Sequence, residues 1–156
     1  MAVRLRPVEQ GDEELLFRVY ASARAEELAV VPWEPGQKEA FLRAQFDAQA
    51  RWYREHYAAA SFAVVEVDGA PAGRFYVYRG EAEYRIVDIA LLPDQRGNGI
   101  GGALLRELLA EADAAGRRVT IHVERLNPAL RLYERLGFTL AEDKGIYLLL
   151  ERQPAT

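Results

Sequence analysis

The chain lacks cysteine altogether and has only two histidines among its 156 residues. Without cysteine there can be no disulfide, no thiolate nucleophile and no Cys-ligated zinc. The two histidines, His56 and His122, do not share a metal-ligand spacing, so we expect no metal site. Long apolar runs and a signal peptide are also missing, which predicts a cytoplasmic protein without membrane contact.

Basic residues are also fewer than acidic ones. Twenty Lys and Arg residues face 24 Asp and Glu, and the net charge of −4 argues against a nucleic-acid partner. Half of the residues are hydrophobic, and a chain of this length buries one core, so we predict a single domain over residues 1–156. Either a monomer or a homodimer fits this composition.

Hydrophobic periodicity and turn residues predict the order β-α-α-β-β-β-α-β-α-β-β, an α+β fold with a mixed sheet. Asp12 is expected to cap the first helix, an Asp68-Gly69 turn joins two antiparallel strands, and Gly116 ends a later helix. The predicted strands are 3–6, 61–67, 72–78, 83–91, 118–124, 138–141 and 145–151; the helices are 12 to about 30, 37–56, 100–115 and 128–137.

A glycine-dense loop over residues 96–102 lies between a strand and the helix that begins near Ile100. Glycine has no Cβ, so several backbone N–H groups can point at one place, and the helix N-terminus adds about half a positive charge. The loop therefore predicts a phosphate or pyrophosphate site, to which Arg96 can add a planar donor fork.

Other interpretations of this loop are open. It could be only a turn, or Gly97-x-Gly99-x-x-Gly102 could be a dinucleotide fingerprint, with Glu124 as the ribose-binding acid. The loop follows an antiparallel meander, and too few residues come after it for repeated βαβ units. A dinucleotide-binding protein is therefore a remote alternative.

Two motifs carry a resemblance to a known family. RxxGxG at residues 96–101 resembles the acyl-CoA pyrophosphate loop of the GNAT family of N-acetyltransferases, and NPAxxLYERLGF at residues 127–138 resembles a downstream segment of that family. The motifs follow in the family's order with a strand between them. The predicted element order resembles the whole family fold.

The resemblance implies acetyl-CoA as cosubstrate, no metal, and a cleft where the strand that ends near Leu91 splays from the strand that starts near Arg118. Asn127 would bond the pantetheine arm or order the cleft, besides capping a helix. The pantetheine arm would lie along Ile89, Ala90 and Leu91, and the pyrophosphate on Arg96, Gly97, Asn98, Gly99, Ile100, Gly101 and Gly102.

By the same resemblance, a neutral amine attacks the thioester while the Leu91 N–H holds the developing oxyanion. Tyr133 would point at the sulfur and protonate the leaving thiolate, since a phenol pKa near 10 is roughly matched to a thiol near 8.5. Packing in an amphipathic helix is the alternative role for Tyr133.

His122 is the first candidate for the base that takes the amine proton. It shares one face of its predicted strand with Thr120 and Glu124, and a histidine pKa near 6.5 suits a base. A purely structural histidine and deprotonation by water are alternatives. Further candidates stand on the preceding strand: Glu83, Tyr84 and Asp88.

The amine acceptor, a small molecule or a protein or peptide amine, cannot be identified from the sequence. Residues 24–28 with Trp33, Trp52 and Tyr53 are expected to line its pocket, where Glu26 and Glu27 would suit a cationic amine unless they form a solvated helix face. The leading hypothesis is an acetyl-CoA-dependent N-acetyltransferase. A catalytically silent acyl-CoA-binding module is the alternative.

Overall fold

The computed structural model describes residues 1–155, and the chain divides into two compact units. The first unit comprises Met1–Phe75 and Ile89–Arg96, and the second comprises Tyr76–Asp88 and the chain from Gly97 onward. Strands β3 (Ala70–Arg79) and β4 (Glu83–Leu91) contribute residues to both units. The single domain remains a prediction.

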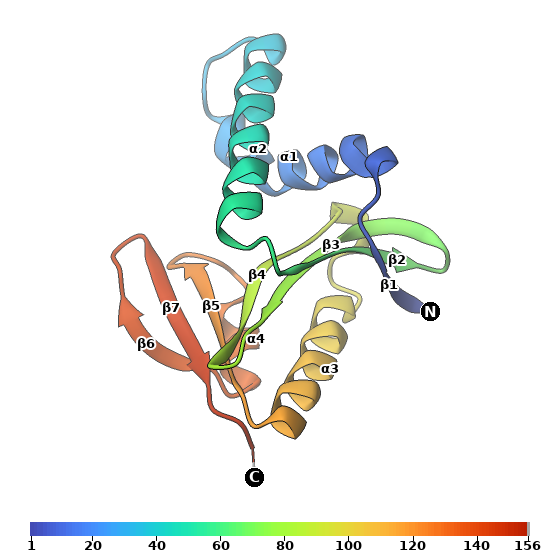
Figure 1. The fold of residues 1–156 in the computed structure, drawn as a ribbon. Coiled ribbons are helices and arrows are strands. Elements are labelled where there is room, and N and C mark those ends of the chain that lie inside the picture. Colours follow the sequence, from blue (N-terminus) through green and yellow to red (C-terminus); the bar gives the residue numbers. More distant parts are fainter. Residues whose placement is uncertain (156) are drawn as a thin grey trace. The chain divides into compact units, whose positions relative to one another are not determined.

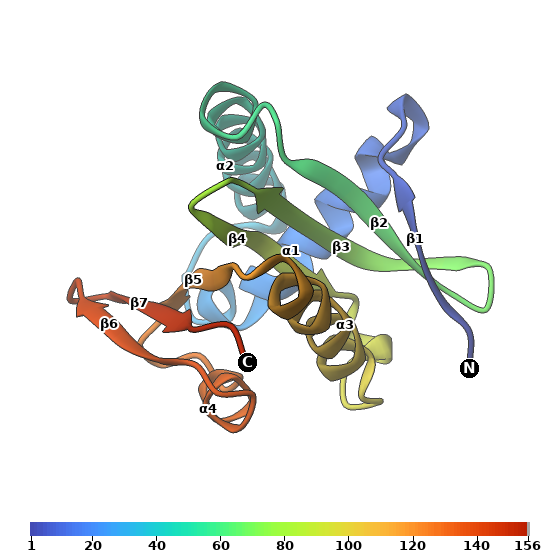
Figure 2. The same ribbon diagram turned by 60° about the horizontal axis from the view of Figure 1, so that its bottom comes forward.

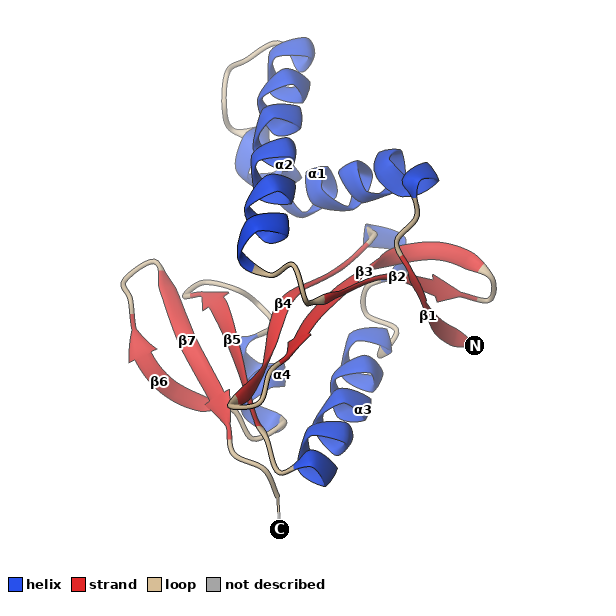
Figure 3. Ribbon diagram, viewed as in Figure 1, coloured by secondary structure: helices blue, strands red, loops and turns tan. Residues whose placement is uncertain are grey.

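Seven strands form one sheet in the order β1-β2-β3-β4-β5-β7-β6, drawn as red arrows in Figure 3. The β4–β5 ladder is parallel, whereas the β1–β2, β5–β7 and β6–β7 ladders are antiparallel. This confirms the predicted α+β fold with a mixed sheet. Besides β3 and β4, the strands are β1 Val3–Pro7, β2 Ser61–Val67, β5 Arg118–Glu124, β6 Thr139–Asp143 and β7 Tyr147–Arg152.

Two long helices belong to the first unit, α1 (Glu13–Ala29) and α2 (Pro35–His56) (Figure 1). Helix α1 buries two adjacent stripes at helical spacing, so that one stripe packs on α2 and the other on β2. The α1–α2 cluster consists of Leu16, Phe17, Tyr20, Leu28, Leu42 and Phe46, and the α1–β2 cluster of Leu15, Val19 and Val64.

The prediction that Asp12 caps α1 is wrong. A 3-10 turn, η1 (Gln10–Asp12), precedes the helix, and the Asp12 side chain makes no cap hydrogen bond to it. Both Asp12 carboxylate oxygens instead accept hydrogen bonds from the Arg6 guanidinium of β1, each at 2.8 Å. The Glu9 N–H also donates to this carboxylate at 2.7 Å. A charged partner on a strand therefore outcompetes the local capping role.

The turn between β2 and β3 has the predicted conformation. Asp68 and Gly69 have φ of +51° and +84°, the left-handed values that a two-residue type I′ hairpin needs.

Helix α3 (Ile100–Ala115) packs on β5 within the second unit (Figure 2). Its bounds agree with the sequence prediction. Gly116 ends it with φ of +66° and donates its N–H to carbonyls of the last turn, as predicted for a C-terminal glycine. The buried positions recur at helical spacing: Ile100, Leu104, Leu105, Leu108, Leu109 and Ala112.

Helix α4 (Leu130–Arg135) is shorter than predicted, because Pro128 and Ala129 form a turn before it. Asn127 still stabilises this turn, since its Oδ1 accepts the Ala129 N–H at 2.8 Å. The β6–β7 hairpin follows, as predicted, with β7 beside β5. Of the helices in residues 1–155, none is long and apolar enough to cross a membrane.

Candidate functional site

Strands β4 and β5 pair over only part of their length. The parallel ladder runs from Glu83 opposite Arg118 to Ile86 opposite Ile121, and within the second unit Asp88 and His122 lie beyond its last pair. His122 pairs instead with Leu149 of β7 on the other side of β5. The carboxyl-terminal part of β5 thus leaves its β4-side backbone groups outside the ladder, as the predicted splay requires.

The glycine loop presents open backbone at the N-terminus of α3. The bond from Ala103 N–H to Gly99 O (3.0 Å) closes the first helical turn, so the N–H groups of Ile100, Gly101 and Gly102 have no partner within the helix. Gly97 and Gly99 have φ of +78° and +77° and are exposed. Apart from the adjoining residues and the backbone of α3 itself, no heavy atom lies within 4 Å of the place a Cβ at position 101 would occupy. A ligand can therefore reach these amides.

Arg96 makes contacts that the sequence did not predict. Its Nε donates to the Leu91 carbonyl at 3.1 Å, and an Nη donates to Ser22 Oγ of α1 at 3.5 Å. Its backbone N–H donates to Pro93 O at 3.3 Å. The guanidinium expected to meet phosphate thus holds the end of β4 and α1 within the first unit. Of the expected pantetheine-binding residues, Ile89, Ala90 and Leu91 are half-buried there.

Tyr133 is a buried phenol on α4 with 4% of its surface exposed, and its ring packs edge-on against Phe138 at 5.6 Å. Burial and the nearby charge of Asp88 raise the pKa of Tyr133 to about 12. The phenol therefore keeps its proton at neutral pH and can donate it, but its match to a thiol of pKa near 8.5 is poorer than the sequence argument assumed. The structure brings Tyr133 and Asp88 within electrostatic range.

His122 is an exposed imidazole between two cations. Its Nε2 lies 3.1 Å from Lys144 Nζ, and its Nδ1 lies 3.5 Å from an Arg85 Nη. Desolvation, Arg85 and Lys144 lower the pKa of His122 below its usual 6.5, while Glu142 and Glu83 act in the opposite direction. The imidazole is thus neutral at pH 7 and able to accept a proton.

The two other base candidates on β4 lie toward the paired end of the strand. Glu83 is held by Arg85 at 3.1 Å and Arg118 at 3.4 Å. It stands five residues before Asp88, about 16 Å along an extended strand. Tyr84 has the Arg79 guanidinium 5.9 Å from its ring centre. Of the four candidates for the base, only Asp88 and His122 therefore lie at the end where β4 and β5 no longer pair.

The predicted common face of Thr120 and His122 is confirmed by Arg85, whose Nε donates to Thr120 Oγ1 at 2.7 Å while its Nη approaches His122. No group of three metal-ligating side chains occurs in residues 1–155. Asn127 is half-buried beside the turn that it caps.

The expected acceptor residues are only partly brought together. A cavity between α1 and α2 is lined by Ala25 and Leu28 of the predicted segment, but Glu26 and Glu27 are not in its lining. Trp33 packs against Phe41 with ring centres 5.2 Å apart. Trp52 stacks on His56, and Tyr53 packs on Trp52 near the other end of α2.

Comparisons of the sequence with curated proteins return acetyltransferases. Mycothiol acetyltransferase of Corynebacterium aurimucosum is 41% identical over 61 residues, which is 38% of this chain and 20% of that protein. A candidate ribosomal protein bS18-alanine N-acetyltransferase of Bacillus subtilis is 37% identical over 82 residues, 50% of this chain and 53% of that protein. The chain thus spans a fifth to about half of the length of these relatives.

Solved structures share the fold over nearly the whole chain. PaiA N-acetyltransferase of Thermoplasma acidophilum, in complex with coenzyme A, has a TM-score of 0.74 at 18% identity and covers 98% of this chain and 99% of that one. A GNAT family acetyltransferase of Elizabethkingia anophelis with acetyl-CoA bound has a TM-score of 0.62 at 15% identity, with 97% of each chain covered. At these identities the likeness concerns the fold.

A sequence profile of the acetyltransferase (GNAT) family matches residues 23–138, which is more than half of the chain. The match includes both motifs and the elements between them. It confirms the family that the two motifs predicted, a family of acetyltransferases. The chain belongs to the GNAT family of acetyltransferases.

Proposed function

We propose that this protein transfers the acetyl group of acetyl-CoA to a primary amine by direct attack in a ternary complex. The observation that carries the proposal is the open backbone of residues 97–102 at the N-terminus of α3. Unpaired N–H groups and the helix dipole suit the pyrophosphate of the cosubstrate. Backbone groups of Ile89, Ala90 and Leu91 would bind its pantetheine arm, with Asn127 beside it.

Acetyl-CoA supplies a thioester whose carbonyl carbon accepts the amine. As the C–N bond forms and the C–S bond breaks, the Leu91 N–H would stabilise the charge that develops on the carbonyl oxygen. The electron pair of the broken bond leaves on sulfur, where the Tyr133 hydroxyl would donate its proton. With a pKa near 12, Tyr133 acts first as a hydrogen-bond donor and gives up its proton only as the thiolate forms.

The proton of the attacking amine needs an acceptor. His122 is neutral at pH 7 because its pKa is lowered, and its Arg85 and Lys144 neighbours favour that neutral form. Asp88 is the second candidate, at the same unpaired end of β4, and a bound water is the third. Glu83 stays a more distant alternative because it is ion-paired at the other end of the ladder.

A cytoplasmic location and a monomeric or homodimeric state belong to the same proposal. The names of the curated relatives differ, one referring to mycothiol and the other to an alanine of ribosomal protein bS18, and only part of each relative matches this chain. Their acceptors therefore do not transfer to this chain. A thiol-release assay distinguishes the enzyme from a silent acyl-CoA-binding module. The enzyme releases free CoA thiol from acetyl-CoA when an amine acceptor is added, and the silent module does not.

The test compares Gly101→Val with a control, Ala110→Val, at an exposed position on the same helix. A Cβ at position 101 would lie in open space beside the helix backbone, so the variant should fold while its methyl groups obstruct the pyrophosphate. We expect CoA affinity by calorimetry to fall at least tenfold, about 1.4 kcal/mol, in Gly101→Val alone. Unchanged affinity in a folded Gly101→Val protein contradicts the site, and CoA binding without turnover of any amine contradicts the enzyme.

A further inference from the structure

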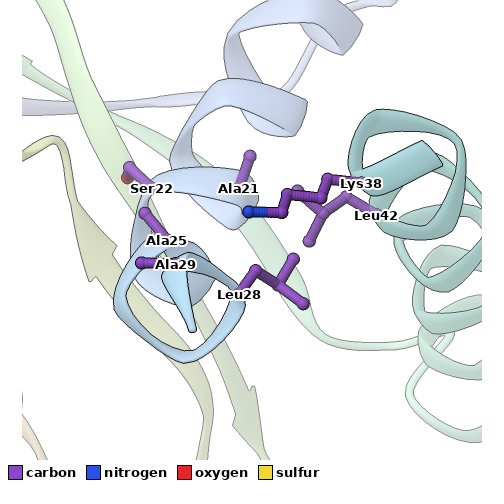
Figure 4. A pocket seen from close by; sticks show the side chains of 7 residues that line it. All are labelled: Ala21, Ser22, Ala25, Leu28, Ala29, Lys38 and Leu42. Atoms are coloured by element: carbon purple, nitrogen blue, oxygen red, sulfur yellow. The ribbon is translucent and has the colours of Figure 1, made fainter. Parts of the chain in front are cut away.

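The first unit contains a cavity of about 390 Å³ between α1 and α2 (Figure 4). Ala21, Ala25 and Ala29 recur every fourth residue and form one smooth wall on α1, about 12 Å long at 1.5 Å per residue. Leu28 and Leu42 complete the apolar lining. Leu28 lies on α1 beside the alanines and Leu42 lies on α2, and the short alanine side chains leave room for an unbranched hydrocarbon chain.

Lys38 is the one charged residue in this lining. Figure 4 shows its side chain reaching from α2 toward α1, with the nitrogen at the end that points to α1. Lys38 as a residue is half-buried, and within residues 1–155 its ammonium has no hydrogen bond or ion pair. A cation near the N-terminus of α2 is also on the less favourable end of the helix dipole. An anionic group entering the cavity would meet an unpaired positive charge.

Ser22 connects the same cavity to the reacting end of the proposed site. It lines the cavity, and its Oγ accepts a hydrogen bond from Arg96 at 3.5 Å. Arg96 in turn donates to the Leu91 carbonyl at 3.1 Å. Leu91 carries the N–H that we propose for the oxyanion. All of these residues belong to the first unit, so the cavity has a cationic group at Lys38 and, at Ser22, a link through Arg96 to Leu91.

We propose that this cavity selects an acceptor with an apolar chain that carries a primary amine at one end and a carboxylate at the other. The carboxylate would pair with Lys38, the chain would lie on the alanine wall, and the amine would lie on the Ser22 side. This rests on the proposed function and narrows its substrate. It replaces the expectation of a cationic acceptor, because Glu27 is paired with Arg24 at 3.2 Å and neither Glu26 nor Glu27 lines the cavity.

The test uses acceptors that differ only at the far end of the chain: 6-aminohexanoate, hexylamine and 1,6-diaminohexane, with shorter and longer members of each series. Their amines titrate close to the lysine value of about 10.4, so the reactive neutral fractions are similar. We expect kcat/KM to be at least tenfold higher for the best aminoalkanoate than for the matching alkylamine, and lowest for the diamine, because a second ammonium is repelled by Lys38.

Lys38→Gln should abolish this preference by raising KM for the aminoalkanoate, while hexylamine is acetylated as before. Lys38→Arg should restore part of the preference. Arg54→Gln removes one positive charge from an exposed position on the same helix and should retain the full preference. Equal melting temperatures of the three variants would exclude a merely structural effect.

Two outcomes overturn the inference while leaving acetyl transfer intact. One is a wild-type enzyme that acetylates hexylamine or 1,6-diaminohexane as efficiently as 6-aminohexanoate and its homologues. The other is a Lys38→Gln enzyme that keeps the wild-type preference. If acetyl-CoA binds and no amine of any class is acetylated, the proposed function fails and this inference fails with it.

Discussion

Gly73 of β3 lies so close to Ala90 of β4 that a Cβ at position 73 would stand 2.2 Å from the Ala90 carbonyl oxygen. It would also lie 2.9 Å from the Leu91 Cα. Both clashes are with backbone, which cannot rotate away as a flexible side chain can. The approach occurs within the first unit, next to the bond from Leu92 N–H to Ala72 O at 2.8 Å. Glycine at this position therefore sets the backbone at the end of β4, where we place the oxyanion donor.

Gly73→Ala should therefore disturb both stability and cofactor binding. We expect the free energy of unfolding to fall by about 1–3 kcal/mol, as for an overpacked core position, and CoA affinity to fall with it. Urea denaturation and calorimetry measure the two effects. Gly36→Ala on α2 is the control, because its Cβ would enter open space. If the Gly73→Ala protein is as stable as Gly36→Ala and keeps wild-type CoA affinity, the β4 backbone can shift to accept the Cβ, and the prediction is wrong.

Local signals explain what the sequence could predict. The bounds of α3, β2, β4 and β5 follow from periodicity and from Gly and Pro at their ends, and the observed elements agree. Asp12 was misassigned because its Arg6 partner sits on another element, which no local pattern reveals. Helix α4 was predicted to begin two residues too early because the Pro128-Ala129 turn resembles a first helical turn, and to end two residues too late.

The candidate site likewise has one part that the sequence could predict and another part that it could not. The glycine loop is a contiguous segment, so its backbone geometry could be predicted. The contacts of Arg96 with Leu91 and Ser22 and the place of Lys38 depend on how α1, α2 and β4 pack, which one sequence does not specify. Gly73 did carry a usable signal, since a glycine inside a strand often marks close backbone approach.

The Arg6–Asp12 pair predicts a specific acid sensitivity. Hydrogen bonds from Arg6 lower the pKa of Asp12 from 3.8 to about 2. Because the folded pKa lies below the unfolded one, the pair stabilises the fold above about pH 4, and this contribution is lost as the pH falls toward 2. We expect Asp12→Asn to lower the melting temperature at pH 7 and to flatten its decline in that window.

Melting curves from pH 7 to pH 2 measure this effect, with Glu81→Gln at an exposed position as the control. If Asp12→Asn and wild type decline in parallel through the acid window, other carboxylates govern the acid lability.

Tyr133→Phe tests the proposed acid. The variant keeps the ring that packs on Phe138 and loses only the hydroxyl, so CoA affinity should change little. We expect kcat to fall about 10- to 1,000-fold, because the proton matters only as the thiolate forms. With a pKa of about 12, Tyr133 stays protonated in ordinary assays, so it should cause no loss of rate between pH 7 and 10.

Steady-state kinetics and CoA titrations separate these effects. Tyr147→Phe, at a half-exposed tyrosine of β7, provides the matched control. Wild-type turnover by Tyr133→Phe would leave Tyr133 a packing residue.

The last prediction concerns the pH dependence of the reaction. A base must lose its own proton before it can accept one from the amine. If His122 is that base, kcat/KM should rise with pH through its pKa and then level off. Since desolvation and the two neighbouring cations lower that pKa, the midpoint should lie below 6.5. Lys144→Gln removes one cation, 3.1 Å from Nε2, and should move the midpoint to higher pH.

The attacking amine also titrates, so the profile must be measured with two acceptors whose amines differ in pKa. A limb that stays at one pH belongs to the enzyme, and a limb that moves belongs to the acceptor. His122→Ala should remove the fixed limb and lower the plateau. If the fixed limb survives in His122→Ala and disappears in Asp88→Asn, the base lies on β4. If wild type has no fixed limb, the amine loses its proton to water, and the lowered pKa of His122 reflects only desolvation and its two cationic neighbours.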